Sequence, residues 1–123
     1  VVFSHMTHLN RMRERFTDVH TLRVTGGPAH SDVWMQMLAD VSGLRIELPQ
    51  VEETGCFGAA LAARVGTRVY RDFSEAQRDL QHPVRTLLPD MAAHQLYQQK
   101  YQRYQHLIAA LQGYHARIKE HTL

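Results

Sequence analysis

The sequence TLRVTGGPAHSDV, residues 21–33, decides the fold of this chain. It opens with the alternating apolar residues of a short strand and continues through Gly26 and Gly27, which lack a Cβ atom and allow a sharp turn close to a ligand. Ser31 then caps a helix, whose free amide groups and positive dipole end point back at the turn. This arrangement favours phosphate binding. An ordinary strand-to-helix turn that binds nothing explains the same residues, and both interpretations stay open at this point.

Length and composition are those of one ordinary globular domain. The 123 residues are 44% hydrophobic and 21% charged, with a formal net charge of +2. So small a positive charge does not favour nucleic acid or an anionic membrane as a partner. The single cysteine, Cys56, excludes an internal disulfide, and no apolar run approaches the roughly 20 residues of a membrane span. We therefore expect a soluble, cytoplasmic protein.

The chain starts inside a helical pattern. Val2, Met6 and Leu9 fall near one face of a helix that we expect over residues 1–16. No initiator methionine or capping residue precedes this helix. We therefore expect the sequence to be a fragment of a longer protein.

Two strands joined through a helix set the fold class. The helix is expected to begin at Ser31 and end at Gly43, and its apolar residues at helical spacing are Val33, Trp34, Met37, Leu38 and Val41. A strand at residues 21–25 precedes it, and a strand at residues 44–48, with one buried and one wetter face, suits a sheet edge. A crossover of this length makes the two strands parallel, so the fold class is α/β.

Small side chains dominate the next expected helix, residues 54–66, with Thr54 as its cap. Tight packing of this helix on the sheet explains the small residues, and room for a bound nucleotide is the alternative. A short helix capped at Ser74 and running to about Leu80 follows.

The C-terminal third contains an extended segment and a long helix. Residues 84–88, bracketed by Pro83 and Pro89, cross the surface or pair at a sheet edge. Asp90 would cap the final helix, which runs for about six or seven turns. Its stripe at spacings of three and four, interpreted as core packing, consists of Tyr97, Tyr101, Tyr104, Ile108, Leu111, His115 and Ile118.

Residues that could support metal binding or catalysis have simpler explanations. His5 and His8 lie three residues apart, but a metal site needs further ligands that the sequence does not place nearby. Cys56 has no basic neighbour, so we expect a packed thiol. Asp32 and Asp40 are expected to be a helix cap and a surface charge.

Two acidic neighbours are ambiguous. Glu52 and Glu53 either interact with the dipole of the following helix or support the neighbouring site. The sequence contains neither a P-loop motif nor a G-x-S-x-G elbow.

Three motifs follow one another in the sequence: VTGGPAHS at residues 24–31, WMQMLADVSGL at residues 34–44 and EETGCFGAALAA at residues 52–63. In this order they resemble the C-terminal domain of the FGGY carbohydrate kinases. The corresponding family patterns are a TGG turn, a W-x-Q-x-x-A-D-x-x-G helix and an E-x-x-A-x-G-A-A helix. The likeness covers most of residues 1–69, extends to the tyrosine-rich last helix, and is strongest to the bacterial L-xylulose kinases.

The resemblance implies an actin-like ATPase architecture, in which two ribonuclease-H-like domains close on Mg-ATP and a ketose sugar. This chain would be the later part of the second domain, with two parallel strands, flanking helices and a long C-terminal helix. By the same likeness, Gly26 and Gly27 offer backbone amides to the nucleotide. Ser31 would approach the adenine or ribose, and the helix around Gly58 and Ala59 would back the cleft.

Pro28 departs from the family pattern, since many relatives carry Gly or Ala there. Proline has no amide hydrogen to donate. If the family contact at this step is a backbone N–H, it is lost in this chain. If the contact is packing against the base, Pro28 can provide it.

The family places its catalytic aspartate, its sugar site and most Mg²⁺ and phosphate contacts in the other, N-terminal domain. We therefore expect no catalytic residue in this chain and no sugar phosphorylation by the chain alone. The open side of the parallel pair predicts a homo-oligomer. The alternative function is a non-catalytic oligomerisation or interaction module that binds no nucleotide.

Overall fold

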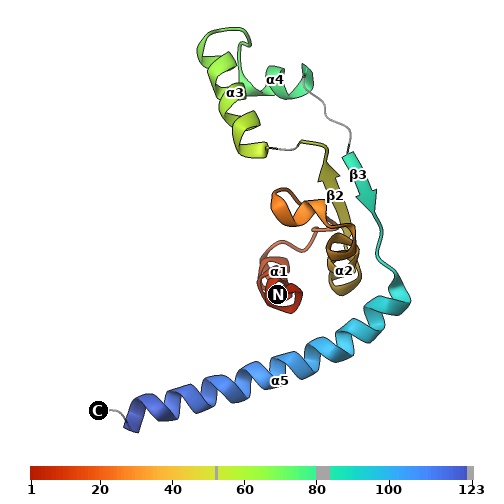
Figure 1. Ribbon diagram of the computed structural model, residues 1–123, viewed down its shortest axis with the longest axis vertical. Helices are drawn as coiled ribbons and strands as arrows, with labels where there is room; N and C mark the ends of the chain where they lie inside the picture. Colours follow the sequence, from red (N-terminus) through yellow and green to blue (C-terminus); the bar gives the residue numbers. More distant parts are fainter. Residues whose placement is uncertain (52, 80–83, 122–123) are drawn as a thin grey trace.

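The computed structural model describes residues 1–51, 53–79 and 84–121 (Figure 1). The elements, in chain order, are helix α1 (Val2–Arg15), strand β1 (Thr21–Arg23), the 3₁₀ helix η1 (Gly27–His30), α2 (Asp32–Ser42), β2 (Arg45–Pro49), α3 (Thr54–Gly66), α4 (Phe73–Asp79), β3 (Val84–Leu87) and α5 (Met91–His121). Among the described residues, no helix is both long and apolar enough to cross a membrane.

The three strands form one mixed sheet in the order β1-β2-β3. Strands β1 and β2 are parallel, with Leu22 opposite Ile46, which confirms the expected parallel pair. Strand β3 runs antiparallel to β2, with Arg85 opposite Leu48. Residues 84–87 therefore pair at a sheet edge, one of the two expected alternatives. The prediction that β2 is an edge strand was wrong, because β3 covers its second side.

Helix α2 begins and ends as the sequence predicts. The Ser31 hydroxyl accepts a hydrogen bond from the Trp34 amide at 3.3 Å, and Gly43 ends the helix with φ +67°. Met35 and Ala39 are buried against Ile46 and Leu48 in the main core.

The face that α2 buries differs from the predicted one at two positions, Val33 and Met37, which are both exposed. Val33 is 75% exposed, because α2 turns residues 35 and 39 toward the sheet. Val41 faces a second core, formed with α1 and α5 around Met6 and Tyr101.

Aromatic rings join α1 to the first half of α5. The Phe3 ring lies 5.6–6.4 Å, centroid to centroid, from the rings of Tyr97, Tyr101 and Tyr104. The Tyr101 hydroxyl is also 3.0 Å from Oγ1 of Thr7. The predicted core role of the tyrosine stripe is therefore confirmed for these residues.

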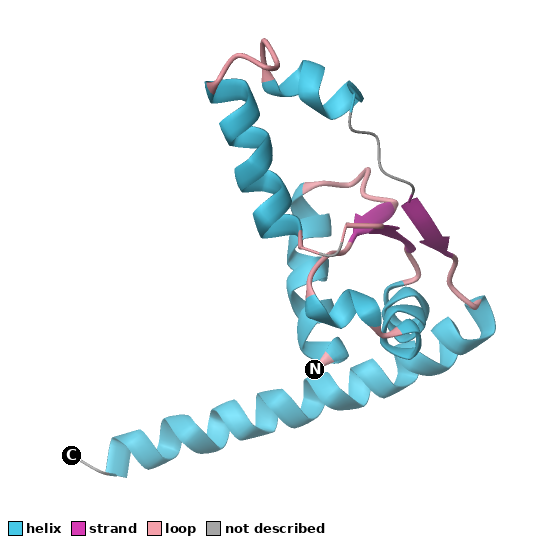
Figure 2. Ribbon diagram, turned by 45° about the horizontal axis from the view of Figure 1, so that its top comes forward, coloured by secondary structure: helices cyan, strands magenta, loops and turns pink. Residues whose placement is uncertain are grey.

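The second half of α5 extends beyond the body of the protein (Figures 1 and 2). The helix has 31 residues, longer than the sequence predicts. Leu107, Leu111 and Tyr114 are 57%, 49% and 63% exposed. The prediction of a core stripe was wrong for Leu111, His115 and Ile118, which are exposed, because α1 packs against Tyr97, Tyr101 and Tyr104 in the first half of α5.

Helices α3 and α4 pack on each other at the end of the sheet away from α5 (Figure 1). Leu61 is the one α3 residue that the structure describes as buried, and most of the small residues of α3 are exposed. Tight packing of α3 on the sheet, the expected explanation for them, is therefore absent from the described part of the chain. Thr54 is the first helical residue and not the cap, since Glu53 occupies the cap position without a side-chain hydrogen bond.

Asp72, and not the predicted Ser74, caps α4. Oδ1 of Asp72 accepts a hydrogen bond from the Glu75 amide at 2.8 Å. In return, Oε2 of Glu75 accepts a hydrogen bond from the Arg71 amide at 2.7 Å. The first of these contacts is the main reason that the pKa of Asp72 is lowered. The predicted helix end at Leu80 and the bracketing Pro83 lie outside the described residues.

Candidate functional site

The Gly-Gly turn lies where the parallel strands β1 and β2 end, next to the first turn of α2. Ligands of α/β proteins bind at this edge, outside the carboxyl ends of the strands. Gly26 adopts φ +91° and ψ −177°, a conformation that is essentially restricted to glycine. Gly27 and Pro28 then open the 3₁₀ helix η1 that leads into α2.

Hydrogen-bond donors of the turn are unused in the described part of the chain. Among the described residues, the amides of Gly26 and Gly27 have no hydrogen-bond partner. A Cβ atom added at either position would meet no atom within 4 Å. The turn can therefore offer two amide groups to an anionic or polar ligand, although Pro28 cannot add a third.

A hollow of about 360 Å³ lies beside the turn. Leu48, Pro49, Val51 and Ala29 form its apolar part, and the polar part consists of His30, Asp32, Gln50 and Arg85. Of the apolar residues, Leu48, Pro49 and Val51 lie at or just after the end of the strand that the sequence predicts at residues 44–48. The sequence gives no signal for Arg85, which reaches the hollow only because β3 pairs with β2.

Asp32 and Arg85 form an ion pair at the rim of this hollow. Nη2 of Arg85 donates to Oδ1 of Asp32 at 2.6 Å. This hydrogen bond, followed by the positive charge of the guanidinium, lowers the pKa of Asp32. The pair fastens β3 to the start of α2 and keeps a carboxylate ionised at the rim.

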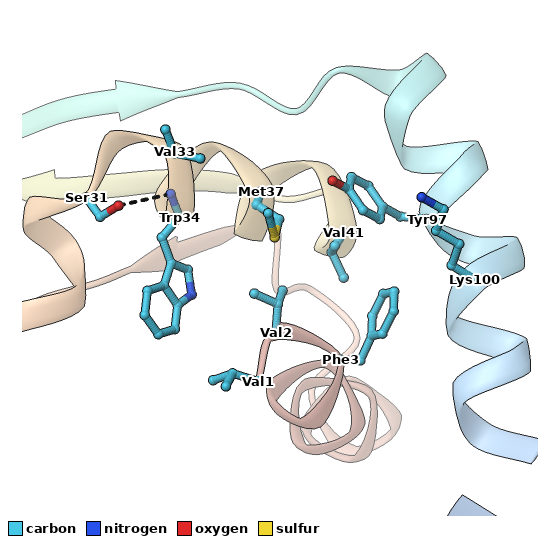
Figure 3. Close-up of a pocket in the computed structure, with 10 residues that line it drawn as sticks. All are labelled: Val1, Val2, Phe3, Ser31, Val33, Trp34, Met37, Val41, Tyr97 and Lys100. Carbon is cyan, nitrogen blue, oxygen red and sulfur yellow. Dashed lines mark hydrogen bonds between the residues drawn. The ribbon is translucent and has the colours of Figure 1, made fainter. Parts of the chain in front are cut away.

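Ser31 and Pro28 face other surfaces than this hollow. Ser31 uses its hydroxyl to cap α2 and lines a larger cleft of about 550 Å³ between α1, α2 and α5, where Val2, Trp34 and Tyr97 also lie (Figure 3). Pro28 lines a third hollow with His5 and His8 of α1.

Gly58, the remaining predicted site residue, lies on the exposed surface of α3, and a Cβ atom there would meet no atom within 4 Å. The structure therefore brings Gly26, Gly27, Pro28 and Ser31 together in one turn. Among the described residues that line the hollow, however, none is one of these four or Gly58.

Asp40 has a structural role that the sequence prediction missed. It is 9% exposed, so the prediction of a surface charge was wrong. Its Oδ1 accepts hydrogen bonds from Nε2 of Gln36 at 2.8 Å and from the Asp90 amide at 2.9 Å. Asp40 thereby joins α2 to the start of α5.

The other candidate residues that the structure describes do not form a second site. Cys56 is exposed, so the expected packed thiol was wrong. In the part of the chain that the structure describes, no group of three or more His, Cys, Asp or Glu residues could hold a metal ion. Glu53 is exposed, and Glu52 lies outside the described residues.

Comparison with known sequences identifies close relatives. The profile of the FGGY family of carbohydrate kinases, C-terminal domain, matches residues 1–67. The chain is 94% identical over all its 123 residues to L-xylulose/3-keto-L-gulonate kinase of Escherichia coli, and covers 25% of that protein. A probable L-xylulose kinase of Pasteurella multocida is 52% identical over 92% of the chain, which covers 22% of that relative. The chain thus spans about a quarter of the length of these relatives.

Solved structures share the fold. A xylulose kinase from Lactobacillus acidophilus superposes with a TM-score of 0.76 at 21% identity, over 89% of this chain and 22% of the kinase. A kinase from Brucella ovis gives a TM-score of 0.74 at 27% identity, over 91% of this chain and 23% of its own. The expected α/β architecture with a long C-terminal helix is therefore confirmed.

Proposed function

The chain belongs to the FGGY family of carbohydrate kinases, and on this basis we propose that it is part of the C-terminal domain of an ATP-dependent pentulose kinase. The observation that carries the proposal is the 94% identity over 123 residues to a kinase named for L-xylulose and 3-keto-L-gulonate. We propose L-xylulose as the ketose. The relatives are about four times as long as this chain, which supports a further, N-terminal domain in the parent protein.

In this proposal the Gly-Gly turn holds the adenosine side of ATP. The unpaired amides of Gly26 and Gly27 and the open space around the Cβ positions of both glycines support a nucleotide there. Pro28 would pack against the base, and Ser31 would lie near the adenine or ribose while its hydroxyl caps α2. Gly58 would back the cleft from α3.

The transferred phosphoryl group comes from ATP, and Mg²⁺ neutralises its charge when bound. We assign the catalytic aspartate and most of the metal contacts to the rest of the parent enzyme, and propose that it acts in the cytoplasm. Within the described residues, the carboxylates near the turn have structural partners: Asp32 pairs with Arg85, and Asp40 joins α2 to α5. We therefore propose that the chain orients the nucleotide and does not act on the sugar.

The proposal can be tested with a chimera. The matching quarter of the Escherichia coli kinase is replaced by residues 1–123 of this chain, and phosphorylation of L-xylulose is followed in a coupled assay. We expect kcat and the KM for ATP within about threefold of the parental kinase, because the exchanged segments are 94% identical. A folded chimera without kinase activity would contradict the proposal, as would turnover by the isolated 123-residue chain.

Self-association is a second proposal, favoured by the exposed apolar residues Leu107, Leu111 and Tyr114 on the second half of α5. A homo-oligomer would remove them from water. The same surface suits the alternative of a non-catalytic interaction module. Light scattering after size-exclusion chromatography, at several concentrations, should give a dimer or larger species. A monomer at every concentration would contradict self-association. Nucleotide binding measured by calorimetry would argue against the non-catalytic alternative.

A further inference from the structure

We propose that Asp32, held by Arg85, binds a ribose hydroxyl of the nucleotide. This inference rests on the proposed kinase function and adds a residue that selects a ribonucleotide. Arg85, which positions Asp32, lies outside residues 1–67 that match the family profile.

The first support is the geometry of the carboxylate. Arg85 occupies Oδ1 of Asp32 at 2.6 Å, whereas Oδ2 has no hydrogen-bond partner among the described residues. An ionised carboxylate only accepts hydrogen bonds, and a sugar hydroxyl is a donor that suits it. The carboxylate is ionised at neutral pH, and the lowered pKa of Asp32 extends this acceptor state to more acidic solution.

The second support is the place of Asp32 in the hollow. It stands in the first turn of α2, which follows the Gly-Gly turn and η1 in the chain, while Leu48, Pro49 and Val51 form an apolar wall on the same hollow. In this proposal the adenosine end of the nucleotide lies at the turn, and its ribose enters this hollow beside Asp32. The volume of about 360 Å³ is within the range of small-molecule sites, about 300–1,000 Å³. In other nucleotide sites an acidic residue likewise accepts a ribose hydroxyl.

The third support is the way in which Arg85 fixes the carboxylate. Arg85 is anchored on β3, opposite Leu48 of β2, so its position depends on the sheet and not on a loop. An aspartate held by a charge-assisted hydrogen bond is oriented before the ligand arrives, which lowers the entropy cost of binding. Arg85 is therefore a positioning residue, and Asp32 is the residue that touches the nucleotide.

The experiment compares ATP with 2′-deoxy-ATP and 3′-deoxy-ATP in the chimeric kinase. We expect at least one deoxy analogue to have a KM about tenfold above that of ATP, the cost of a lost hydrogen bond to a charged group. Asp32→Asn should raise the KM for ATP and bring the ratio of the KM for the deoxy analogue to the KM for ATP close to one. The kcat and the KM for the sugar should change less than about twofold. Arg85→Met should lower the ratio in part, and Arg85→Lys should restore some of it.

The matched control is Glu47→Gln. Glu47 forms a comparable exposed ion pair with Arg23 at 2.8 Å, away from the hollow, and its loss should leave the ratio unchanged. A purely structural role for Asp32 would lower the melting temperature without changing the ratio, and that result would overturn the inference. A wild-type chimera that uses the deoxy analogues as well as ATP would also overturn the inference. So would an Asp32→Asn chimera in which the KM changes only for an ATP analogue that lacks the adenine amino group.

Failure of the kinase proposal is recognised separately. Calorimetry gives the dissociation constants of ATP and of the deoxy analogues, and their ratio measures the same selectivity without any turnover. A chimera that binds ATP selectively but phosphorylates no sugar would overturn the proposed reaction and leave the inference standing. A folded chimera that binds none of the nucleotides would overturn both.

Discussion

Gly43 and the imidazole of His94 lie so close that a Cβ atom at position 43 would come within 2.8 Å of Cε1 of His94. His94 cannot easily withdraw, because its Nδ1–H donates to the Asp40 carbonyl at 2.8 Å. The end of α2 and the start of α5 are therefore joined at a position where only glycine fits. Gly43 also has φ +67°, which side chains other than that of glycine rarely adopt.

Gly43→Ala should lower the free energy of unfolding by about 2–3 kcal/mol, from the left-handed backbone and the displaced imidazole together. Urea unfolding followed by circular dichroism measures the change. The control is Gly113→Ala inside α5, where a Cβ atom meets nothing within 4 Å. This substitution should raise the free energy of unfolding by about 0.5–1 kcal/mol, because alanine favours a helix more than glycine does. Equal stability of Gly43→Ala and wild type would show that α5 does not pack on α2 in this way.

The two glycines of the turn should respond differently to alanine. Gly26→Ala should cost about 1–3 kcal/mol in stability, because φ is +91° there. Gly27→Ala should change stability by less than about 0.5 kcal/mol, since its Cβ atom would enter open space. In the chimera it should nevertheless raise the KM for ATP several-fold, because the added methyl group projects from the turn that is proposed to hold the nucleotide. An unchanged KM for ATP in Gly27→Ala would argue against a nucleotide at the turn.

The contact between Thr7 and Tyr101 should stabilise the docking of α1 on α5. Their side-chain oxygens are 3.0 Å apart, and Tyr101 is buried. A double-mutant cycle of Thr7→Val and Tyr101→Phe should give a coupling free energy of about 0.5–1.5 kcal/mol, measured by urea unfolding. Additive effects of the two substitutions would mean that the hydroxyl groups do not interact.

Acid should weaken the contact between Asp32 and Arg85. The hydrogen bond and the charge of Arg85 place the pKa of Asp32 below its ordinary value in the folded protein. The resulting stabilisation is therefore complete above the ordinary aspartate pKa and is lost as the pH falls through the lowered pKa. An NMR titration of the Asp32 carboxyl carbon should give a lower midpoint in wild type than in Arg85→Met. Identical midpoints would contradict the ion pair.

Local chemistry made part of this structure predictable from the sequence. Ser31 and Gly43 mark the ends of α2 because a hydroxyl cap and a left-handed glycine act within a few residues. The parallel pair β1-β2 followed from the length of the crossover. The motif at residues 24–31 placed the Gly-Gly turn after the first strand of the parallel pair, where the structure has it.

The missed features depend on contacts between distant residues. Arg85 reaches Asp32 across 53 positions through the pairing of β3 with β2, and no local pattern around Arg85 indicates it. Asp40 resembles a surface charge until the start of α5 is placed beside it. Leu111 continues the stripe of Tyr97 and Tyr101, but the sequence does not tell where α1 stops covering α5.

Hydrogen–deuterium exchange tests the central claim, that this chain holds the nucleotide of a sugar kinase at its Gly-Gly turn. The chimeric kinase is compared with and without a saturating non-hydrolysable ATP analogue. The amides of Gly26 and Gly27 have no partner in the described structure, so they should exchange fast without nucleotide and become protected when it binds. We predict at least tenfold slower exchange in a peptide covering residues 24–33 and no change in one covering residues 107–121 of α5. Unchanged exchange of residues 24–33 at saturation would contradict the account.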